Sequence, residues 1–241
     1  MKNIKNSIIV AVLLPLCVFW LCNTHAQQVQ RSSFSPKVGT LEQKLIARGL
    51  VDIQVVDADI EVDLKYSTTD NFLKRDVYGD LQRAYLQPMA AQKLARANRE
   101  LKKSNPELHL LVYDAARPRT VTQLFWDYMS HIPPKKREDF VADPALGSVH
   151  NFGCAVDLTI ADATGQALDM GTPFDYNGLL AYPTKETEML KAGKLTQKQV
   201  NNRLLLRRAM KTAGYDSITS EWWHFNALAR EKAKKRYGFI E

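Results

Sequence analysis

The chain has 241 residues, a formal net charge of +7 and three cysteines. This length fits one domain with a sizeable core, and the basic balance suits a protein that works near anionic polymers. Because Cys17 and Cys22 lie in the first 26 residues, only Cys154 remains beyond them, which excludes an internal disulfide in the rest of the chain.

Residues 1–26 have the pattern of a secretory signal peptide. Lys2 and Lys5 precede a nearly continuous apolar run over residues 8–22, and Thr24-His25-Ala26 offers a cleavage site. The apolar run is shorter than the roughly 20 residues that a membrane-spanning helix needs. We therefore expect an exported, periplasmic protein with no stable membrane insertion after signal cleavage and no nucleic-acid partner. The alternative is an uncleaved N-terminal membrane anchor.

Residues 27–39 are polar and predict a linker, followed by one domain over residues 40–241. The hydrophobic patterns predict several helices and strands in that domain. Helices and strands alternate without a βαβ rhythm, so we expect a single compact α+β domain with a largely antiparallel sheet flanked by helices. The expected helices are 41–47, 88–103, 119–130, 197–214 and the charged tail 230–236; the expected strands are 51–56, 60–66, 108–113, 154–160 and segments within 215–225.

The run Ser-Val-His-Asn-Phe-Gly-Cys-Ala-Val-Asp at residues 148–157 contains two candidate metal ligands. Side chains alternate along a strand, so Asp157 lies on the face opposite Cys154 and the apolar positions that follow it. Gly153 permits a turn that brings His150 back toward Asp157. This pattern favours His150 and Asp157 as ligands and places Cys154 on the wrong face to be one.

A second motif, Glu-Trp-Trp-His at residues 221–224, adds a histidine and a glutamate. The tryptophans favour a strand, on which residues three apart point to opposite faces, so a turn or bulge at Glu221 is needed to bring both side chains to one site. A hydrolytic zinc takes three protein ligands and leaves one position open for water. His150, Asp157 and His224 can supply those ligands for one zinc ion per chain, with Glu221 as the base.

Arg117 follows the predicted strand 108–113 and precedes Pro118. A residue before proline is restricted to extended backbone, which helps hold its side chain in place. A fixed guanidinium can stabilise the oxyanion that forms when water attacks a carbonyl. The alternative is a surface or ion-paired arginine with a structural role.

Three patterns, S-x-H-x-x-G-x-A-x-D, E-W-W-H and Y-D-x-x-R-P, together resemble the zinc D-alanyl-D-alanine dipeptidases of the VanX type, peptidase family M15. The similarity extends to residues 65–72 and 170–175, and so covers roughly residues 50–226. The resemblance implies a compact α+β domain. Ala116 departs from the family pattern, which usually has an aromatic residue before the arginine.

The resemblance also implies roles for individual residues. His150, Asp157 and His224 would bind zinc, Glu221 would be the catalytic base, and Arg117 would stabilise the transition state. Ser148 and Asp175 would hold the ammonium group of the substrate, and Tyr66 would line the pocket.

The predicted activity is zinc-dependent hydrolysis of D-alanyl-D-alanine or a similar small D,D-dipeptide, in the turnover of cell-wall peptides. One alternative is a related D,D- or L,D-carboxypeptidase or endopeptidase acting on longer peptidoglycan stems, against which the match at Asp175 argues. Another is a non-catalytic zinc-binding module. That alternative requires a fourth protein ligand, which the sequence does not offer. No oligomeric state is predicted.

Overall fold

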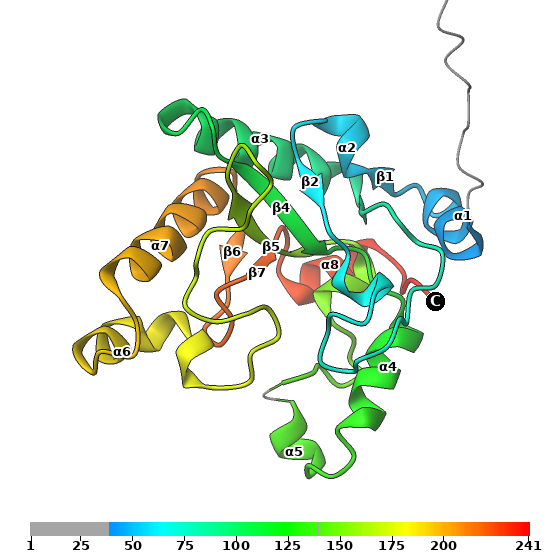
Figure 1. The fold of residues 1–241 in the computed structure, drawn as a ribbon. Helices are drawn as coiled ribbons and strands as arrows, with labels where there is room; N and C mark the ends of the chain where they lie inside the picture. Colours follow the sequence, from blue (N-terminus) through cyan, green and yellow to red (C-terminus); the bar gives the residue numbers. More distant parts are fainter. Residues whose placement is uncertain (1–38, 139) are drawn as a thin grey trace, which may run out of the picture. The chain divides into compact units, whose positions relative to one another are not determined.

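The domain is built around a five-stranded mixed sheet with the strand order β2-β4-β5-β7-β6 (Figure 1). Strands β2 and β4 are parallel, and every other neighbouring pair is antiparallel. The expected α+β class with a largely antiparallel sheet is therefore confirmed. The strands are β2 (Glu61–Val62), β4 (His109–Asp114), β5 (Ala155–Ala161), β6 (Asp216–Ser217) and β7 (His224–Asn226).

The computed structural model describes residues 39–138 and 140–241. The predicted signal peptide and residues 27–38 of the predicted linker lie outside these residues. None of the helices within the described ranges has the length and apolar character needed to cross a bilayer.

Two long helices, α3 (Pro88–Ser104) and α7 (Gln197–Thr212), pack against each other and against strands β4 and β5. Pro88 occupies the first turn of α3, where its missing N–H costs no hydrogen bond. Thr196 caps α7, accepting a hydrogen bond from Gln199 N at 3.2 Å. The remaining helices are α1 (Thr40–Ala47), α2 (Ile53–Val56), α4 (Arg119–Tyr128), α5 (Pro134–Arg137), α6 (Glu186–Lys191) and α8 (Arg230–Arg236), with short 3₁₀ helices η1 (Lys65–Ser67), η2 (Val149–Phe152), η3 (Leu179–Ala181) and η4 (Pro183–Lys185).

The prediction of a strand over residues 51–56 is wrong beyond its first two residues. Strand β1 (Val51–Asp52) pairs with β3 (Tyr85–Leu86), and the chain then enters α2. The Asp52 side chain accepts a hydrogen bond from Gln54 N at 2.9 Å, which caps this helix. The local capping interaction thus outweighs the strand preference of the Val and Ile side chains.

The strand predicted over residues 60–66 is likewise short. Only Glu61–Val62 pair with β4, and Tyr66 lies in the 3₁₀ helix η1. Within 215–225, the two short strands β6 and β7 are separated by a segment that contains Glu221.

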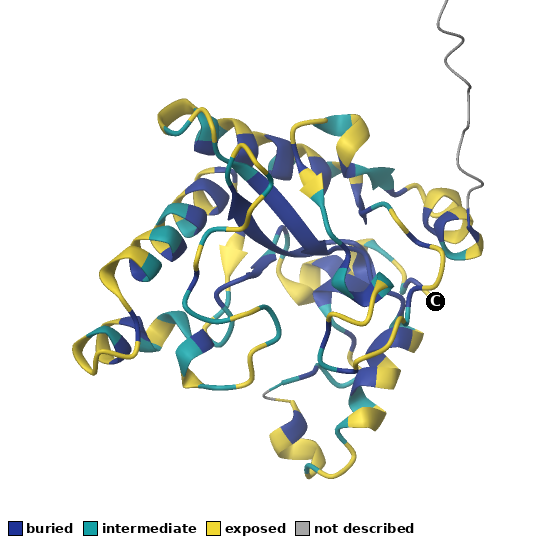
Figure 2. Cartoon of the chain, in the orientation of Figure 1, coloured by how far each residue is buried: buried dark blue, intermediate teal, exposed yellow. Residues whose placement is uncertain are grey.

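The sheet centre places several polar residues side by side. All seven residues of β5 are buried, so both of its faces are covered (Figure 2). The register pairs Asp157 with His224 on one neighbouring strand and with Asp114 on the other, where β4 contains an irregularity between Val112 and Asp114. Three adjacent strands therefore bring two carboxylates and an imidazole to one point.

Candidate metal centre

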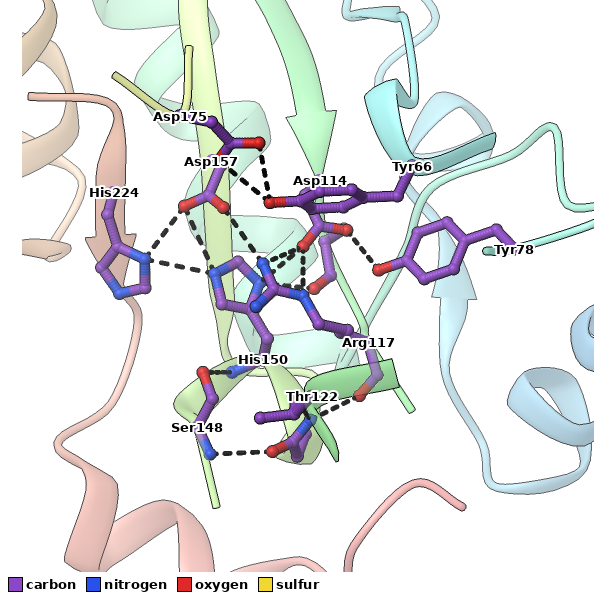
Figure 3. A network of polar contacts seen from close by, with 12 residues as sticks. Tyr66, Tyr78, Asp114, Arg117, Thr122, Ser148, His150, Asp157, Asp175 and His224 are labelled. Carbon is purple, nitrogen blue, oxygen red and sulfur yellow. Dashed lines mark hydrogen bonds and ion pairs between the residues drawn. The ribbon is translucent and has the colours of Figure 1, made fainter. Parts of the chain in front are cut away.

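Three predicted ligands converge at this point of the sheet (Figure 3). His224 Nδ1 lies 2.9 Å from Asp157 Oδ1 and 3.2 Å from His150 Nε2. His150 Nε2 lies 3.3 Å from the same Asp157 oxygen. All three residues are buried, so their polar atoms contact one another instead of water.

His150 reaches this point from η2, directly before β5. Ser148 and Asn151 form a reciprocal cap at the start of η2, and Gly153 ends it with φ +66°. A side chain is strained at that backbone angle, and a Cβ at Gly153 would lie 2.9 Å from Leu50 Cδ2. Gly153 thus allows the turn that folds His150 back toward Asp157, as the sequence predicts.

The hydrogen bonds of both rings determine which nitrogen faces the centre. His150 Nδ1 lies 2.6 Å from the carbonyl oxygen of Ala115, which can only accept, so Nδ1 carries the hydrogen. His224 Nε2 lies 3.0 Å from Asn226 Oδ1 and donates to it. His150 Nε2 and His224 Nδ1 are the ring nitrogens that face each other and the Asp157 carboxylate. Each can bind a metal ion when unprotonated, or donate to Asp157 when the ring is protonated.

The donor set fits zinc. Ligand distances of about 2.0–2.1 Å in a tetrahedron place neighbouring ligand atoms about 3.3 Å apart, close to the three separations found here. Within the described residues the cluster offers three ligands, as in catalytic zinc sites with an open fourth position. Burial opposes the charge of Asp157, but His150 and His224 outweigh burial and hold its pKa well below the usual range.

Glu221 lies beside this cluster. It precedes β7 rather than forming part of it, and a bend over the next two residues brings its Oε2 to 3.8 Å from His224 Nδ1. Burial raises the pKa of Glu221 to about 7, with Asp157 and Asp175 adding to the rise and His224 opposing it. The predicted turn at Glu221 is therefore present, and its carboxyl group can exchange a proton near neutral pH.

Arg117 is buried and ion-paired, and it also lines the cavity of the site. Its Nε donates to Asp114 Oδ2 at 2.8 Å, and its Nη2 lies 3.4 Å from Asp157 Oδ2. The guanidinium carbon lies 4.9 Å from the centre of the Phe125 ring. The arginine is thus held rigidly beside the oxygen of Asp157 that faces away from the two histidines.

Asp114 is a buried residue of this site that sequence reasoning missed. Its Oδ1 accepts a hydrogen bond of 2.6 Å from the Tyr78 hydroxyl, and its Oδ2 binds Arg117 and lies 3.5 Å from His150 Nδ1. The sequence feature that could have indicated Asp114 is its position three residues before Arg117, at the end of a predicted strand. Nothing in the sequence points to Tyr78.

The predicted substrate-binding residues lie around the ligands. The Tyr66 hydroxyl donates to both oxygens of Asp175, at 3.0 and 3.1 Å. Asp175 has φ +59°, a strained angle for a residue with a side chain and one that is concentrated at functional sites. Burial and the nearby Asp157 raise the pKa of Asp175 to about 7.

Ser148 lies at the other end of the ligand group from Asp175 (Figure 3). Its Oγ accepts a hydrogen bond from His150 N at 3.3 Å. The predicted role of these two residues is to hold the ammonium group of the substrate together. That group would have to lie between Ser148 and Asp175, so the role stays a prediction.

One cavity of about 670 Å³ lies at this site, and the buried pair Asp114 and Tyr78 is not part of its lining. Its lining includes all eight residues that the sequence predicts for the site, together with parts of segments 128–148 and 175–182. Ala116 is buried and is not part of the lining. A volume of this size suits a small-molecule ligand.

Comparisons with known proteins identify the family of the chain. The Peptidase M15 family, described as D-Ala-D-Ala dipeptidase, matches residues 46–239. A D-alanyl-D-alanine dipeptidase of Escherichia coli (strain K12) is 34% identical over 176 residues, which cover 73% of this chain and 83% of that protein. One from Enterococcus faecium is 28% identical over 177 residues, covering 68% and 83%.

Among solved structures, the LdcB LD-carboxypeptidase is 18% identical with a TM-score of 0.40, covering 65% of each chain. The family match spans most of the domain, and the relative from E. coli supports it independently. The chain therefore belongs to the D-Ala-D-Ala dipeptidase family of M15 metallopeptidases and is an enzyme, as its sequence predicts.

Proposed function

We propose that this protein is a zinc-dependent dipeptidase that hydrolyses D-alanyl-D-alanine or a similar small D,D-dipeptide. The observation that carries the proposal is the convergence of His150 Nε2, Asp157 Oδ1 and His224 Nδ1, with Glu221 alongside. The names of the curated relatives support the same substrate class.

Zinc bound by these three residues would polarise the peptide carbonyl and lower the pKa of the attacking water. The chain's own groups then handle the proton and the developing charge. The Glu221 carboxylate takes the proton from the attacking water and delivers it to the leaving amine, for which a pKa of about 7 is well matched. The Arg117 guanidinium, fixed by Asp114, stabilises the negative charge on the carbonyl oxygen.

Asp175 and Tyr66 give the site its preference for a free dipeptide. The Asp175 carboxylate binds the ammonium group of the substrate by a charge-assisted hydrogen bond, and the Tyr66 hydroxyl orients that carboxylate. An acylated amine lacks the charge and leaves the partly buried carboxylate without a cationic partner, which is costly.

The export signal predicted at residues 1–26 supports a place of action in the cell envelope. We propose that the mature enzyme is periplasmic and acts on peptides released during cell-wall turnover. A second candidate, a peptidase of longer peptidoglycan stems, is favoured by the cavity volume of about 670 Å³, which is larger than two alanine residues require.

The test compares kcat/KM of the zinc-loaded protein on D-alanyl-D-alanine, its N-acetylated form and a stem pentapeptide. We expect strong preference for the free dipeptide. In the Glu221→Gln variant we expect turnover to fall by about 10²–10⁴, with the zinc content unchanged. Equal rates on the free and acylated substrates, or a preference for the pentapeptide, would replace the dipeptidase proposal with the second candidate.

A further inference from the structure

The cavity carries an imbalance of charge. Five acidic side chains in the described part of the chain line it: Asp157, Asp175, Glu221, Glu138 and Asp143. Among the described residues, Arg117 and Arg230 are the arginines that line it, and no lysine does. Because the proposed mechanism assigns Arg117 to the carbonyl oxygen of the peptide bond, Arg230 is the arginine of this lining left to receive another anionic group of a ligand.

The packing of α8 directs Arg230 toward the site. Ala233 is fully buried in an apolar cluster with Val149 and Phe152 of η2, the helix that carries His150. Residues three apart on a helix share a face. Arg230 is three residues before Ala233, so it lies on the face of α8 that is turned to η2 and the cavity.

The Arg230 guanidinium is only weakly engaged within the chain. Its Nε lies 3.8 Å from Glu231 Oε1, and the two side chains are 47% and 75% exposed. Pairs as exposed as this contribute little free energy. A cation in the first turn of a helix also gains nothing from the helix dipole, which favours acids there. The packing of α8 alone therefore gives no reason for an arginine at this position.

Arg230 and the Asp175 carboxylate lie at different ends of the cavity. Ser148, which begins η2, and Asp175 lie at opposite ends of the metal-ligand group (Figure 3). Arg230 belongs to the helix that packs on η2, and so to the end opposite Asp175. A free dipeptide has an ammonium group at one end and a carboxylate at the other, which is complementary to this distribution.

We infer that Arg230 binds the C-terminal carboxylate of the substrate and selects peptides with a free C-terminus. This inference rests on the proposed function and extends it from the amino end of the substrate to the carboxyl end. The guanidinium of an arginine can donate two parallel N–H hydrogen bonds to the two oxygens of a carboxylate. Asp175 and Arg230 together then fix the length of the substrate, because both of its charged ends must be satisfied while the peptide bond lies at the metal ligands.

The experiment measures kcat/KM on D-alanyl-D-alanine and on its C-terminal amide, which has the same shape but no negative charge. We expect the zinc-loaded wild-type protein to prefer the acid. Arg230→Ala should lower kcat/KM on the acid by roughly tenfold, the low end for a hydrogen bond to a charged group. It should leave the amide unaffected, so that the preference disappears. Arg230→Lys should restore part of it.

Lys232→Ala is the matched control, because it removes one positive charge from the opposite, exposed face of the same helix. It should keep the wild-type preference for the acid. An Arg230→Ala variant that still prefers the acid, or a Lys232→Ala variant with the same loss, would overturn the role of Arg230.

A binding measurement separates this inference from the proposed function. Calorimetric Kd values for the acid and the amide are determined in the Glu221→Gln protein, with and without Arg230→Ala. Tighter binding of the acid that depends on Arg230 supports the inference even if the wild-type protein hydrolyses neither compound. Equal Kd values for acid and amide in the Glu221→Gln protein would refute it even if hydrolysis is fast.

Discussion

Asp157 and His224 face each other on neighbouring strands, whereas Asp175 lies on a long segment between β5 and α6. Backbone hydrogen bonds of the sheet set the positions of the first pair. The segment of Asp175 is instead held by side-chain contacts, including two from α7: Gln199 Nε2 donates to Asp169 Oδ2 at 2.8 Å, and Arg203 Nε donates to Met170 O at 2.6 Å.

This difference matches the demands of the two tasks. Metal ligands must keep their geometry within a few tenths of an ångström, which a central strand pair provides. A substrate-binding carboxylate has to admit and release a ligand, and a segment anchored by a few side-chain contacts permits that. Changes on the sheet should therefore affect the metal, and changes on the segment should affect substrate binding alone.

The largest effect is expected from His224→Ala on the sheet. With one of three ligands removed, the protein should lose its zinc and its turnover should fall to the background rate. Elemental analysis and a dipeptidase assay measure the two effects. His109→Ala is the control, since His109 lies in β4 but outside the cavity lining, and it should keep the metal. Full zinc retention in His224→Ala would remove His224 from the site.

A smaller effect is expected from the ionisation of Asp175. Its pKa is raised to about 7 by burial and by Asp157, and only the ionised carboxylate attracts an ammonium group. KM for the free dipeptide should therefore increase as the pH falls through about 7, and level off above it. Steady-state kinetics between about pH 5 and pH 9 measure this profile.

The Asp175→Asn variant isolates that ionisation, because Glu221 also has a pKa of about 7 and will change kcat over the same range. The variant should bind substrate roughly tenfold more weakly at pH 8 and show a KM that no longer depends on pH, with normal zinc content. An unchanged pH profile of KM would assign the ammonium to another group.

The smallest effect is expected from Gln199→Ala on α7. Loss of the contact with Asp169 should loosen the segment that carries Asp175 and raise KM about two- to fivefold, leaving zinc content and kcat unchanged. Gln199 also caps its own helix, so Thr196→Ala is the control: it removes the cap but keeps the Asp169 contact. An equal rise of KM in both variants would mean that helix stability, not the anchor, sets substrate affinity.

The sequence predicts which side chains meet at the proposed metal site because strand alternation and one glycine turn are local rules that constrain few residues. Asp157 lies on the face away from Cys154, and burial raises the pKa of that thiol to about 12, as befits a buried residue that is not a ligand. The long helix α3 begins at Pro88 and α7 begins directly after its cap Thr196, as predicted.

Other parts of the fold depend on contacts that are distant in the sequence. The Val and Ile side chains of residues 51–56 favour a strand, but the cap supplied by Asp52 favours a helix over most of this segment. The role of Asp114 follows from the partner strands of β4, and that of Arg230 from the packing of α8 on η2. From sequence alone, residues 230–236 read as a solvated helix face, because no local pattern indicates that one of their side chains lines the cavity.

The complete burial of β5, paired on both sides, has a consequence for hydrogen exchange. Because β5 is buried and paired on both sides, we expect its backbone amides to exchange with solvent only when the whole domain unfolds, and the segment 169–178 to open at lower free energy. Asp157 therefore belongs to the slowest-exchanging part of the molecule. Partial openings of the segment 169–178 should leave Asp157 in place in β5. The strand that carries this proposed metal ligand is therefore expected to be among the last parts of the domain to open.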